Sequence, residues 1–567
     1  MPRPGWQDYL RYNRITRTAL LLIALFVLIY QFTPHELTKQ TQSISDYLGD
    51  MVTGSNGEHP RFFKDAITML LNNSPRGIPN LKLSEGEMKA PSYWYIDVPG
   101  EPFTIDFLQK YTEISQAQLT ELSSKHRSVK SNITEFTYPE GVFKGKGIVM
   151  VGGGDFLGTA LTSILTLRDT GSKLPLELIL TSFDEYQADV CEVMLPSLNA
   201  KCIILEEVLG SDLFEGLNLK KYELKVLGLF VSTFEHALLM DADNLAVKSP
   251  DYILNSSLFK KYGYIIWMDF WRQTISPYFY QIAGINIGEP VRKDGIYPDR
   301  DFSSRGESQL ADLEGAIPDS TCEAGQLAIN KRTHFKPLLM TVYYNLLGFK
   351  FYYQLLGQGA VGIGDKDTFI AGLTVFGIEP YFVKQRPLLL GYNYGENEAE
   401  WQDTTMVQYD PVQDFEYYSA AKEYMISKKI DPRINIFLNN DFTNNLRDEM
   451  QKALSGKHTL PQVQFLHMHN PKFNAYSNHI KGDYSIDSHP RRQFGNREKI
   501  SGIIDKDYEL RFLAISEWLA CQSTIIPDNW KVVDRSEYCT AIKEHVAWLK
   551  KTSDTPSLGT VNFKFNF

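Results

Sequence analysis

The pattern of apolar and polar positions between residues 144 and 250 predicts strands that alternate with helices. Short apolar runs bounded by glycine or polar residues indicate buried strands, whereas apolar residues every three or four positions indicate helices. The predicted strands are 147–152, 176–182, 201–205 and 237–240, and the predicted helices are 157–168, 185–194 and 219–232. Such strands pair in parallel through right-handed crossovers. The pattern therefore predicts an α/β domain with a Rossmann-like first half.

The fourth predicted strand runs directly into two carboxylates, Asp241 and Asp243. Side chains of an extended segment alternate in direction, so both carboxylates project to one side. Two carboxylates placed in this way can bind a hard divalent cation, and ligands of open α/β sheets sit at the carboxyl ends of strands. The same Asp-x-Asp pattern occurs elsewhere without an apolar strand before it, at Asp299/Asp301, Asp365/Asp367 and Asp505/Asp507. The first pair is therefore the predicted metal site.

A glycine cluster, 152–154, follows the first predicted strand. Glycine allows the backbone to approach a ligand closely, so Gly152 and Gly153 are candidate ligand-binding positions. The cluster does not match the G-x-G-x-x-G dinucleotide fingerprint, which disfavours NAD as the ligand.

The amino-terminal residues favour a transmembrane signal anchor at 18–35, a segment without Asp, Glu, Lys or Arg. Four arginines precede this segment, whereas Glu36 and Lys39 follow it. By the positive-inside rule, residues 1–17 form a cytosolic tail and the remainder of the chain is lumenal. A cleaved signal peptide would need a small-residue cleavage site, and a buried core helix would not carry four arginines before it. The short apolar span suits a thin Golgi bilayer.

The rest of the chain divides by composition into three parts. Residues 36–140 are predicted to be a stem and helical lead-in, with an amphipathic helix at 105–122. The main α/β domain is predicted at 141–500. A helical extension at 501–567 is predicted to pack on it, with helices at 510–518 and 541–549.

Composition and cysteine usage fit a lumenal globular protein. The net charge of −10 disfavours nucleic acid as a partner, and 43% hydrophobic residues provide material for a core. The five cysteines show no metal-ligand spacing. In an oxidising lumen, Cys191/Cys202 and Cys521/Cys539 are close enough in sequence for local disulfides, which leaves Cys322 over.

Four ordered blocks resemble the fungal Golgi α-mannosyltransferases, the mannan-branching α-1,2 enzymes and their α-1,3 relatives (similar to glycosyltransferase family 71). The blocks are His236-Ala-Leu-Leu-Met-Asp-Ala-Asp-Asn244, Glu323-Ala-Gly-Gln-Leu327, Gly364-Asp-Lys-Asp-Thr-Phe369 and Phe465-Leu-His-Met-His-Asn-Pro-Lys472. The resemblance implies a GT-A type nucleotide-sugar transferase domain behind a single amino-terminal transmembrane helix. Asn244, after the carboxylate pair, is more similar to the α-1,2 branch than to the α-1,3 branch.

The resemblance also implies a reaction and a set of partners. A type II Golgi membrane enzyme would transfer mannose from GDP-mannose to mannose residues of mannan or of an N-glycan outer chain, with retention of configuration. Branching α-1,2 linkages are expected, and a Golgi complex with other mannosyltransferases is a further expected partner. The cofactor would be Mn²⁺, bound between the enzyme and the donor diphosphate.

Residue roles follow from the same resemblance. The expected metal ligands are Asp241, Asp243 and either His467 or His469; both histidines could instead have a packing role. The expected donor-binding residues are Gly152, Gly153, Lys225, Asp241, Gln326 and Lys472. Lys225 could equally be a solvated helix residue. The expected catalytic carboxylates near the sugar are Asp269, Asp365 and Asp367, the last two with an acceptor-hydroxyl role.

Three other hypotheses compete with an α-1,2-mannosyltransferase. The linkage could be α-1,3, or the donor could be a UDP-sugar, because no residue in the chain identifies the base. A protein of a different class, a non-catalytic glycan-binding subunit, could also retain this fold. The intact carboxylate pair with downstream histidines argues against that class.

Overall fold

A computed structural model describes residues 58–561, apart from 85, 87, 95–100, 221, 293–303, 396–398, 439, 473–477, 480–484, 487–488, 532–533 and 560. The predicted tail, the predicted anchor at 18–35 and the first part of the predicted stem lie outside the described residues. Within the described ranges, no helix is long and apolar enough to cross a membrane. The chain divides into two compact units, Met1–Phe62 and Phe63–Phe567, and the α/β body lies within the second.

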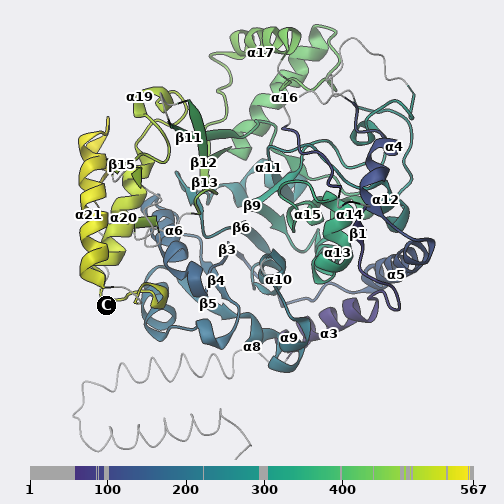
Figure 1. Cartoon of the computed structure of the whole chain (residues 1–567), viewed down its shortest axis with the longest axis horizontal. Helices are drawn as coiled ribbons and strands as arrows, with labels where there is room; N and C mark the ends of the chain where they lie inside the picture. Colours follow the sequence, from purple (N-terminus) through teal and green to yellow (C-terminus); the bar gives the residue numbers. More distant parts are fainter. Residues whose placement is uncertain are drawn as a thin grey trace, which may run out of the picture. The chain divides into compact units, whose positions relative to one another are not determined.

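A seven-stranded mixed sheet forms the centre of this body, in the order β10-β8-β9-β6-β3-β4-β5 (Figure 1). Its strands are β3 (Lys146–Val151), β4 (Leu176–Leu180), β5 (Ala200–Ile204), β6 (His236–Met240), β8 (Tyr264–Met268), β9 (Cys322–Asn330) and β10 (Tyr381–Phe382). Strands β3 to β6 pair in parallel, whereas β9 runs antiparallel between β6 and β8. The predicted α/β class and the four predicted strands are confirmed.

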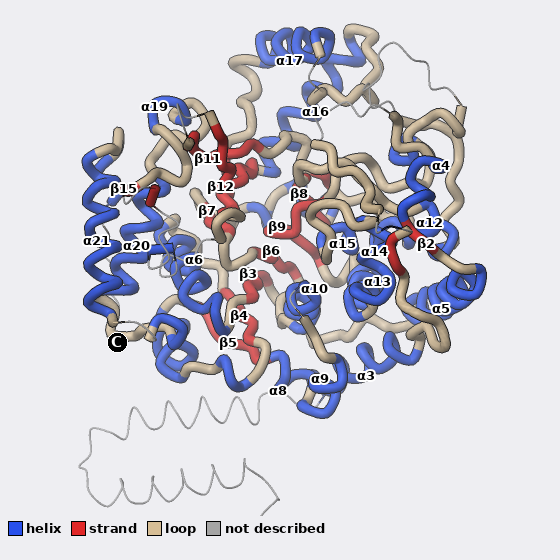
Figure 2. The backbone as a smooth tube through the Cα atoms, viewed as in Figure 1, coloured by secondary structure: helices blue, strands red, loops and turns tan. Residues whose placement is uncertain are grey.

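Helices cover both faces of the sheet (Figure 2). On one face, Ile148 and Met150 of β3 share a core with Leu161 of α6 (Leu157–Asp169). On the other face lies α10 (Tyr222–Val231), where a Cβ added to Gly228 would come within 2.9 Å of a Val151 methyl group. Helices α13 (Phe335–Leu346) and α15 (Lys366–Val375) follow β9 in the chain. The predicted helices 157–168 and 219–232 are confirmed.

Two predicted helices differ from the structure. The segment predicted as one helix at 105–122 is α4 (Ile105–Leu108), a 3-10 turn, strand β2 (Thr112–Glu113) and the start of α5 (Gln116–Glu135). The prediction was wrong because Ser115 forms a capping box with Gln118 and begins a new helix. The segment predicted as one helix at 185–194 also differs. Glu185 is the last residue of a 3-10 turn, and a π-helical segment then spans Asp189–Met194.

A second, four-stranded antiparallel sheet has the order β11-β12-β13-β7. Its strands are β11 (Leu388–Tyr394), β12 (Glu400–Tyr409), β13 (Val463–Met468) and β7 (Asn244–Ala246). Strand β7 begins directly after the segment 241–243, which itself follows β6. The chain therefore passes from the large sheet to the small sheet across the predicted metal-binding pair.

Two carboxyl-terminal helices, α20 (Tyr508–Cys521) and α21 (Arg535–Lys551), lie side by side (Figure 1). Phe512 of α20 belongs to the same core as Leu161 of α6. Disulfides join Cys191 to Cys202 and Cys521 to Cys539, and Cys322 is a buried free cysteine. Both predicted pairings and the helices predicted at 510–518 and 541–549 are confirmed.

The remaining elements surround these layers. Phe63 of α3 packs edge-on against Phe230 of α10, so this part of the predicted stem region contacts the α/β body. The remaining helices and strands are α3 (Glu58–Asn72), α7 (Leu195–Ser197), α8 (Leu205–Leu209), α9 (Ser211–Leu217), α11 (Ser257–Tyr262), α12 (Pro277–Ala283), α14 (Tyr353–Gly357), α16 (Pro411–Ser427), α17 (Asp441–Leu454), α19 (Arg497–Ile500), β1 (Lys82–Leu83), β14 (Ser485–Ile486) and β15 (His489–Pro490).

Candidate active site

Asp241 and Asp243 lie at the junction of the two sheets. The Asp241 amide donates to the Gly325 carbonyl of β9 at 2.8 Å, which extends the large sheet by one residue. The Asp243 carbonyl accepts from the Met468 amide of β13 at 3.0 Å, which belongs to the small sheet. Because a different sheet fixes each end of the segment, the two carboxylates have little freedom to move apart.

His467 of β13 faces this pair. Asp241, Asp243 and His467 each offer one ligand atom, and these atoms lie within 4.8 Å of one another. The His467 Nε2 atom is 3.3 Å from Asp243 Oδ1, and its Nδ1 atom is 3.4 Å from Glu323 Oε1. Burial alone would lower the pKa of His467, but the carboxylates of Asp243 and Glu323 outweigh it and raise this pKa to about 10.

A lysine neutralises each carboxylate of the pair. Lys225 Nζ of α10 lies 2.8 Å from Asp241 Oδ2, and Lys472 Nζ lies 2.8 Å from Asp243 Oδ2. Burial would raise the pKa of Asp243, but His467 and Lys472 hold it well below its usual range. The pKa of Lys225 is raised in turn, because Asp241 and Asp365 outweigh the effect of burial. The cluster thus places two lysine ammonium groups beside two carboxylates.

His469 lies elsewhere. Strand β13 ends at Met468, so the alternation that would put His467 and His469 on one side does not extend to His469. The His469 Nε2 atom instead contacts Asp403 Oδ2 at 2.8 Å. An isolated bridge between His469 and Lys472 turns the chain back, and this turn is what brings Lys472 to Asp243.

Asp269 follows β8 at the same edge of the sheet. Its Oδ2 atom is 2.6 Å from Lys366 Nζ, and Lys366 also donates to Thr321 Oγ1 at 3.0 Å. Asp269 is buried, with 6% of its surface exposed, and Lys366 is its ion-pair partner.

Asp365 and Asp367, at the start of α15, have different surroundings. Asp365 Oδ2 is 3.6 Å from Lys225 Nζ, which places this carboxylate at the Asp241 side of the cluster. Asp367 Oδ1 accepts from the Cys322 amide at 3.0 Å and from Gln273 Nε2 at 3.1 Å. Burial is the main cause that raises the pKa of both carboxyls. Asp367 therefore holds the start of β9, whereas Asp365 faces the charged cluster.

The predicted donor-binding glycines and Gln326 are closely packed. A Cβ on Gly152 would lie 2.5 Å from the Ala160 Cβ, and one on Gly153 would lie 2.0 Å from a Glu185 carboxylate oxygen. Gln326 is fully buried beneath the pair, where its Oε1 atom accepts from Asn244 Nδ2 at 2.5 Å. At these positions the structure shows tight packing around the Asp241–Asp243 turn.

Comparisons with known proteins identify the family of the chain. Residues 145–410 match the family model described as "Mannosyltransferase putative". The chain is 34% identical over 550 residues to Alpha-1,2-mannosyltransferase MNN26 of Candida albicans, covering 90% of this chain and 72% of that protein. It is 30% identical over 541 residues to Alpha-1,2-mannosyltransferase MNN2 of Saccharomyces cerevisiae, covering 90% of this chain and 88% of that protein.

The chain belongs to this mannosyltransferase family. It is therefore a glycosyltransferase, and the resemblance carried by the four sequence blocks is confirmed. A solved structure of the galactosyltransferase LgtC, in complex with donor and acceptor sugar analogues, is 14% identical with a TM-score of 0.26 and covers 42% of this chain and 73% of its own.

The sequence pattern did not predict two residues of the candidate site. Glu323 contacts His467, and Lys366 contacts Asp269. Both residues fall inside the sequence blocks that carry the resemblance, at Glu323–Leu327 and Gly364–Phe369. The position of Glu323 depends on the antiparallel placement of β9, and that of Lys366 depends on the start of α15; no local pattern indicates either.

The mannosyltransferase cluster fits a divalent cation. Two carboxylates and one imidazole are a suitable ligand set for Mn²⁺-type ions. The His467 Nε2 atom is buried 3.3 Å from Asp243 Oδ1 without a hydrogen bond of standard geometry, so it is available to share an ion with that carboxylate. Glu323 beside the other ring nitrogen matches the carboxylate–histidine–metal arrangement that orients such ligands.

Proposed function

We propose that this mannosyltransferase transfers mannose from GDP-mannose to mannose residues of mannan or of an N-glycan outer chain, and that it forms α-1,2 linkages. The relatives that cover most of the chain are named α-1,2-mannosyltransferases. Asn244, directly after the carboxylate pair, supports the same branch of the family.

The observation that carries the proposal is the Asp241–Asp243–His467 group between two lysines. Transfer of a sugar from a nucleotide donor leaves negative charge on the departing diphosphate, and stabilising that charge is the main task of such a site. Lys225 and Lys472 hold two ammonium groups beside the carboxylates, 2.8 Å from Asp241 and Asp243 respectively. These groups are placed to bind phosphate oxygens as point charges.

We infer that Asp241, Asp243 and His467 hold Mn²⁺. When bound, the ion would act as a Lewis acid that neutralises charge on the diphosphate. Glu323 would keep the His467 ring oriented, and Asn244 would support the turn through its bonds to Gly325 and Gln326.

Asp365 is the carboxylate that we assign to the reacting sugar. It is buried, and its Oδ2 atom makes no hydrogen bond with a described residue. Asp269, paired with Lys366, lies at the same sheet edge, where we assign it to the acceptor side. The product is expected to be an α-mannoside from an α-linked donor, so the reaction would retain configuration.

The proposed domain is of GT-A type, and the proposed location is the Golgi membrane with the catalytic domain in the lumen. The charge-free segment 18–35 behind four arginines supports a type II anchor. Two disulfides support an oxidising compartment. A complex with other Golgi mannosyltransferases is part of the same proposal.

The donor is tested by comparing sugar nucleotides. Full-length enzyme loaded with Mn²⁺ is incubated with GDP-mannose, UDP-glucose or UDP-N-acetylglucosamine, and the released nucleoside diphosphate is measured. We expect hydrolysis or transfer with GDP-mannose alone. A preference for either UDP-sugar would overturn the mannosyl donor.

A further inference from the structure

A cavity of about 280 Å³ beside the transfer site is lined by more positive than negative charge. Five basic residues but only two acidic residues line it, although the whole chain has a net charge of −10. None of the predicted donor residues lines this cavity. Its basic lining therefore needs an explanation other than the donor diphosphate.

Several of the lining charges already have partners. Arg433 pairs with Asp431 at 2.6 Å, and Asp319 pairs with Arg272. Arg292 donates to backbone carbonyls, including that of Leu313 at 3.1 Å. Arg386 donates to the Ser320 hydroxyl, so each of the three arginines of the lining has a partner and the two lysines remain.

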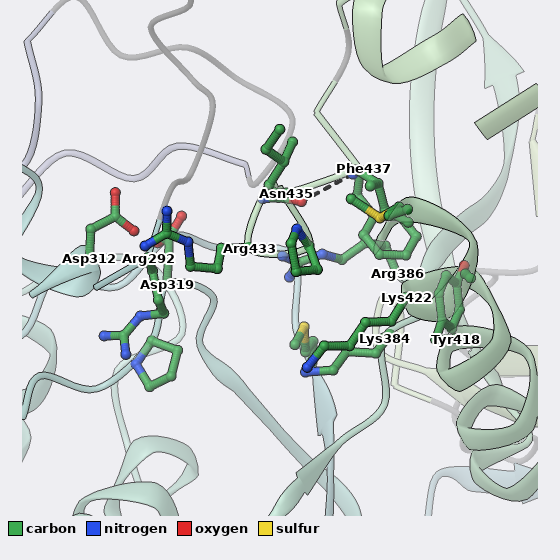
Figure 3. Close-up of a pocket in the computed structure, with 17 residues that line it drawn as sticks. Arg292, Asp312, Asp319, Lys384, Arg386, Tyr418, Lys422, Arg433, Asn435 and Phe437 are labelled. Carbon is green, nitrogen blue, oxygen red and sulfur yellow. Dashed lines mark hydrogen bonds between the residues drawn. The ribbon is translucent and has the colours of Figure 1, made fainter. Parts of the chain in front are cut away.

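Lys384 and Lys422 are the two lysines of this lining. They come from different elements, the loop after β10 and helix α16, and Figure 3 shows their side chains running side by side beneath Arg386. The Lys384 ammonium lies 6.0 Å from the centre of the Phe382 ring, and neither lysine forms an ion pair or a side-chain hydrogen bond with a described residue. Two adjacent ammonium groups repel each other, and an anion between them would remove that repulsion.

The backbone at Lys384 is held firmly. The buried carboxylate of Asp414 accepts from the amides of Lys384 at 2.7 Å and Gln385 at 2.6 Å. Lys384 is exposed, and its pKa is lowered because desolvation, together with Arg386 and Lys422, outweighs the opposing effect of Asp414. The lysine pair is therefore positioned by the fold.

The cavity shares a wall with the transfer site. Arg386 donates to the Ser320 hydroxyl on the cavity side, while the next residue, Thr321, accepts from Lys366 at 3.0 Å on the Asp269 side. Met268, which lines the cavity, immediately precedes Asp269. A ligand in the cavity would thus lie next to the carboxylate assigned to the acceptor side.

We propose that this cavity is an acceptor subsite that binds a phosphate monoester carried on a glycan, through Lys384 and Lys422 with Arg386 beside them. Lysine binds phosphate as a point charge, and arginine adds directional donors. The assignment to an acceptor depends on the proposed transfer function, whereas the anion site itself does not.

The test measures binding to the full chain by calorimetry, with mannose 6-phosphate and inorganic phosphate as probes, in EDTA. We expect mannose 6-phosphate to bind at least tenfold more tightly than inorganic phosphate. The Lys384→Gln/Lys422→Gln variant should lose at least tenfold in affinity, and Lys452→Gln, an exposed lysine on α17, should not. The proposal would be overturned if mannose 6-phosphate did not bind, or if it bound only with Mn²⁺ present. It would also be overturned if the double variant bound as tightly as the wild type, or if both probes bound with equal affinity.

Two further measurements separate the possible failures. The Lys384→Gln/Lys422→Gln variant lacks the repulsion between the two lysines, so its thermal midpoint without phosphate should equal or exceed that of the wild type. A large fall in this midpoint would show that the lysines have a structural role and would contradict the subsite. Transfer to a neutral mannoside should be the same in the wild type and the double variant. Transfer without phosphate binding would sink the subsite alone, and phosphate binding without transfer would sink the proposed function alone.

Discussion

Asp243 contacts more charged groups than its partner in the pair, because His467 and Lys472 both reach its carboxylate. Asp243→Asn keeps the shape of the side chain and removes its charge. We expect transfer to fall at least 100-fold, which corresponds to about 3 kcal/mol of transition-state stabilisation. Mn²⁺ binding, measured by electron paramagnetic resonance of the free ion, should weaken in parallel.

The matched control is Asp505→Asn, in another of the four Asp-x-Asp pairs. Asp505 is exposed and contacts Tyr508 at 3.1 Å, far along the chain from β6. Its substitution should change neither Mn²⁺ binding nor transfer. Full Mn²⁺ affinity in Asp243→Asn would refute the assigned ligand set.

Asp365 and Asp367 are two residues apart in sequence but should respond differently to substitution. Asp365→Asn should lower kcat by 100-fold or more with little change in stability, since its Oδ2 atom holds no hydrogen-bonded neighbour in place. Asp367→Ala removes the acceptor for Cys322 and Gln273 and should cost about 2 kcal/mol of unfolding free energy. Kinetics and urea titrations of both variants test this contrast, and equal losses of kcat at unchanged stability would contradict it.

His126 should make the free energy of unfolding depend on pH. It is buried, its Nε2 atom is 2.7 Å from the Tyr344 hydroxyl, and burial, with Lys130, lowers its pKa from 6.5 to about 3. Because the unfolded chain takes up a proton that the folded protein does not, the stabilising contribution is complete above pH 6.5 and is lost as the pH falls toward 3. Between pH 7 and 5 this residue should account for about 2 kcal/mol.

The measurement for His126 is a pair of urea titrations at pH 7 and pH 5. His126→Gln cannot take up the proton, so its loss of unfolding free energy between the two pH values should be smaller than that of the wild type. An identical loss in both proteins would show that His126 does not titrate as its burial indicates.

At the scale of elements, the Cys521–Cys539 disulfide joins α20 to α21 across a sequence separation of 18. Closing a loop of this length stabilises a fold by about 3 kcal/mol in the chain-entropy model. The Cys521→Ser/Cys539→Ser variant should lose that amount, measured by chemical unfolding of the full chain. If the variant matched the oxidised wild type, this bridge would have no role in holding the carboxyl-terminal helices.

The elements that local patterns could predict are those with a local cause. Strands β3 to β6 and helix α6 follow from short apolar runs and helical periodicity, and the disulfides follow from cysteine spacing. The helix predicted at 105–122 failed because the capping box at Ser115 has a stronger local effect than the apolar period. Periodicity alone does not reveal such a restart.

The site was predictable in type but not in its full membership. Asp241 and Asp243 are recognisable because a buried strand precedes them. The choice of His467 over His469 depends on where β13 ends, and Glu323 depends on β9 lying antiparallel beside β6. These are pairings between segments far apart in sequence, which side-chain alternation within one strand cannot supply.

Across the whole molecule, two sheets and the turn that follows β13 build one site. The large sheet supplies Asp241 and Glu323, the small sheet supplies His467, and the turn after β13 supplies Lys472. Family membership makes the chain a glycosyltransferase, and the charged cluster explains why a nucleotide-sugar donor suits this edge of the sheet. We therefore expect the chain to form α-1,2-mannosidic branches.

The most direct measurement is the linkage of the product. Full-length enzyme with Mn²⁺ is incubated with radiolabelled GDP-mannose and a linear α-1,6-mannan, and the labelled polymer is digested with an α-1,2-specific mannosidase. We expect the polymer to become labelled and to release labelled mannose on this digestion. The Asp243→Asn variant should yield no labelled polymer. Labelled polymer that resists this enzyme but yields to an α-1,3-specific mannosidase would contradict the linkage, and an unlabelled polymer would contradict the transfer itself.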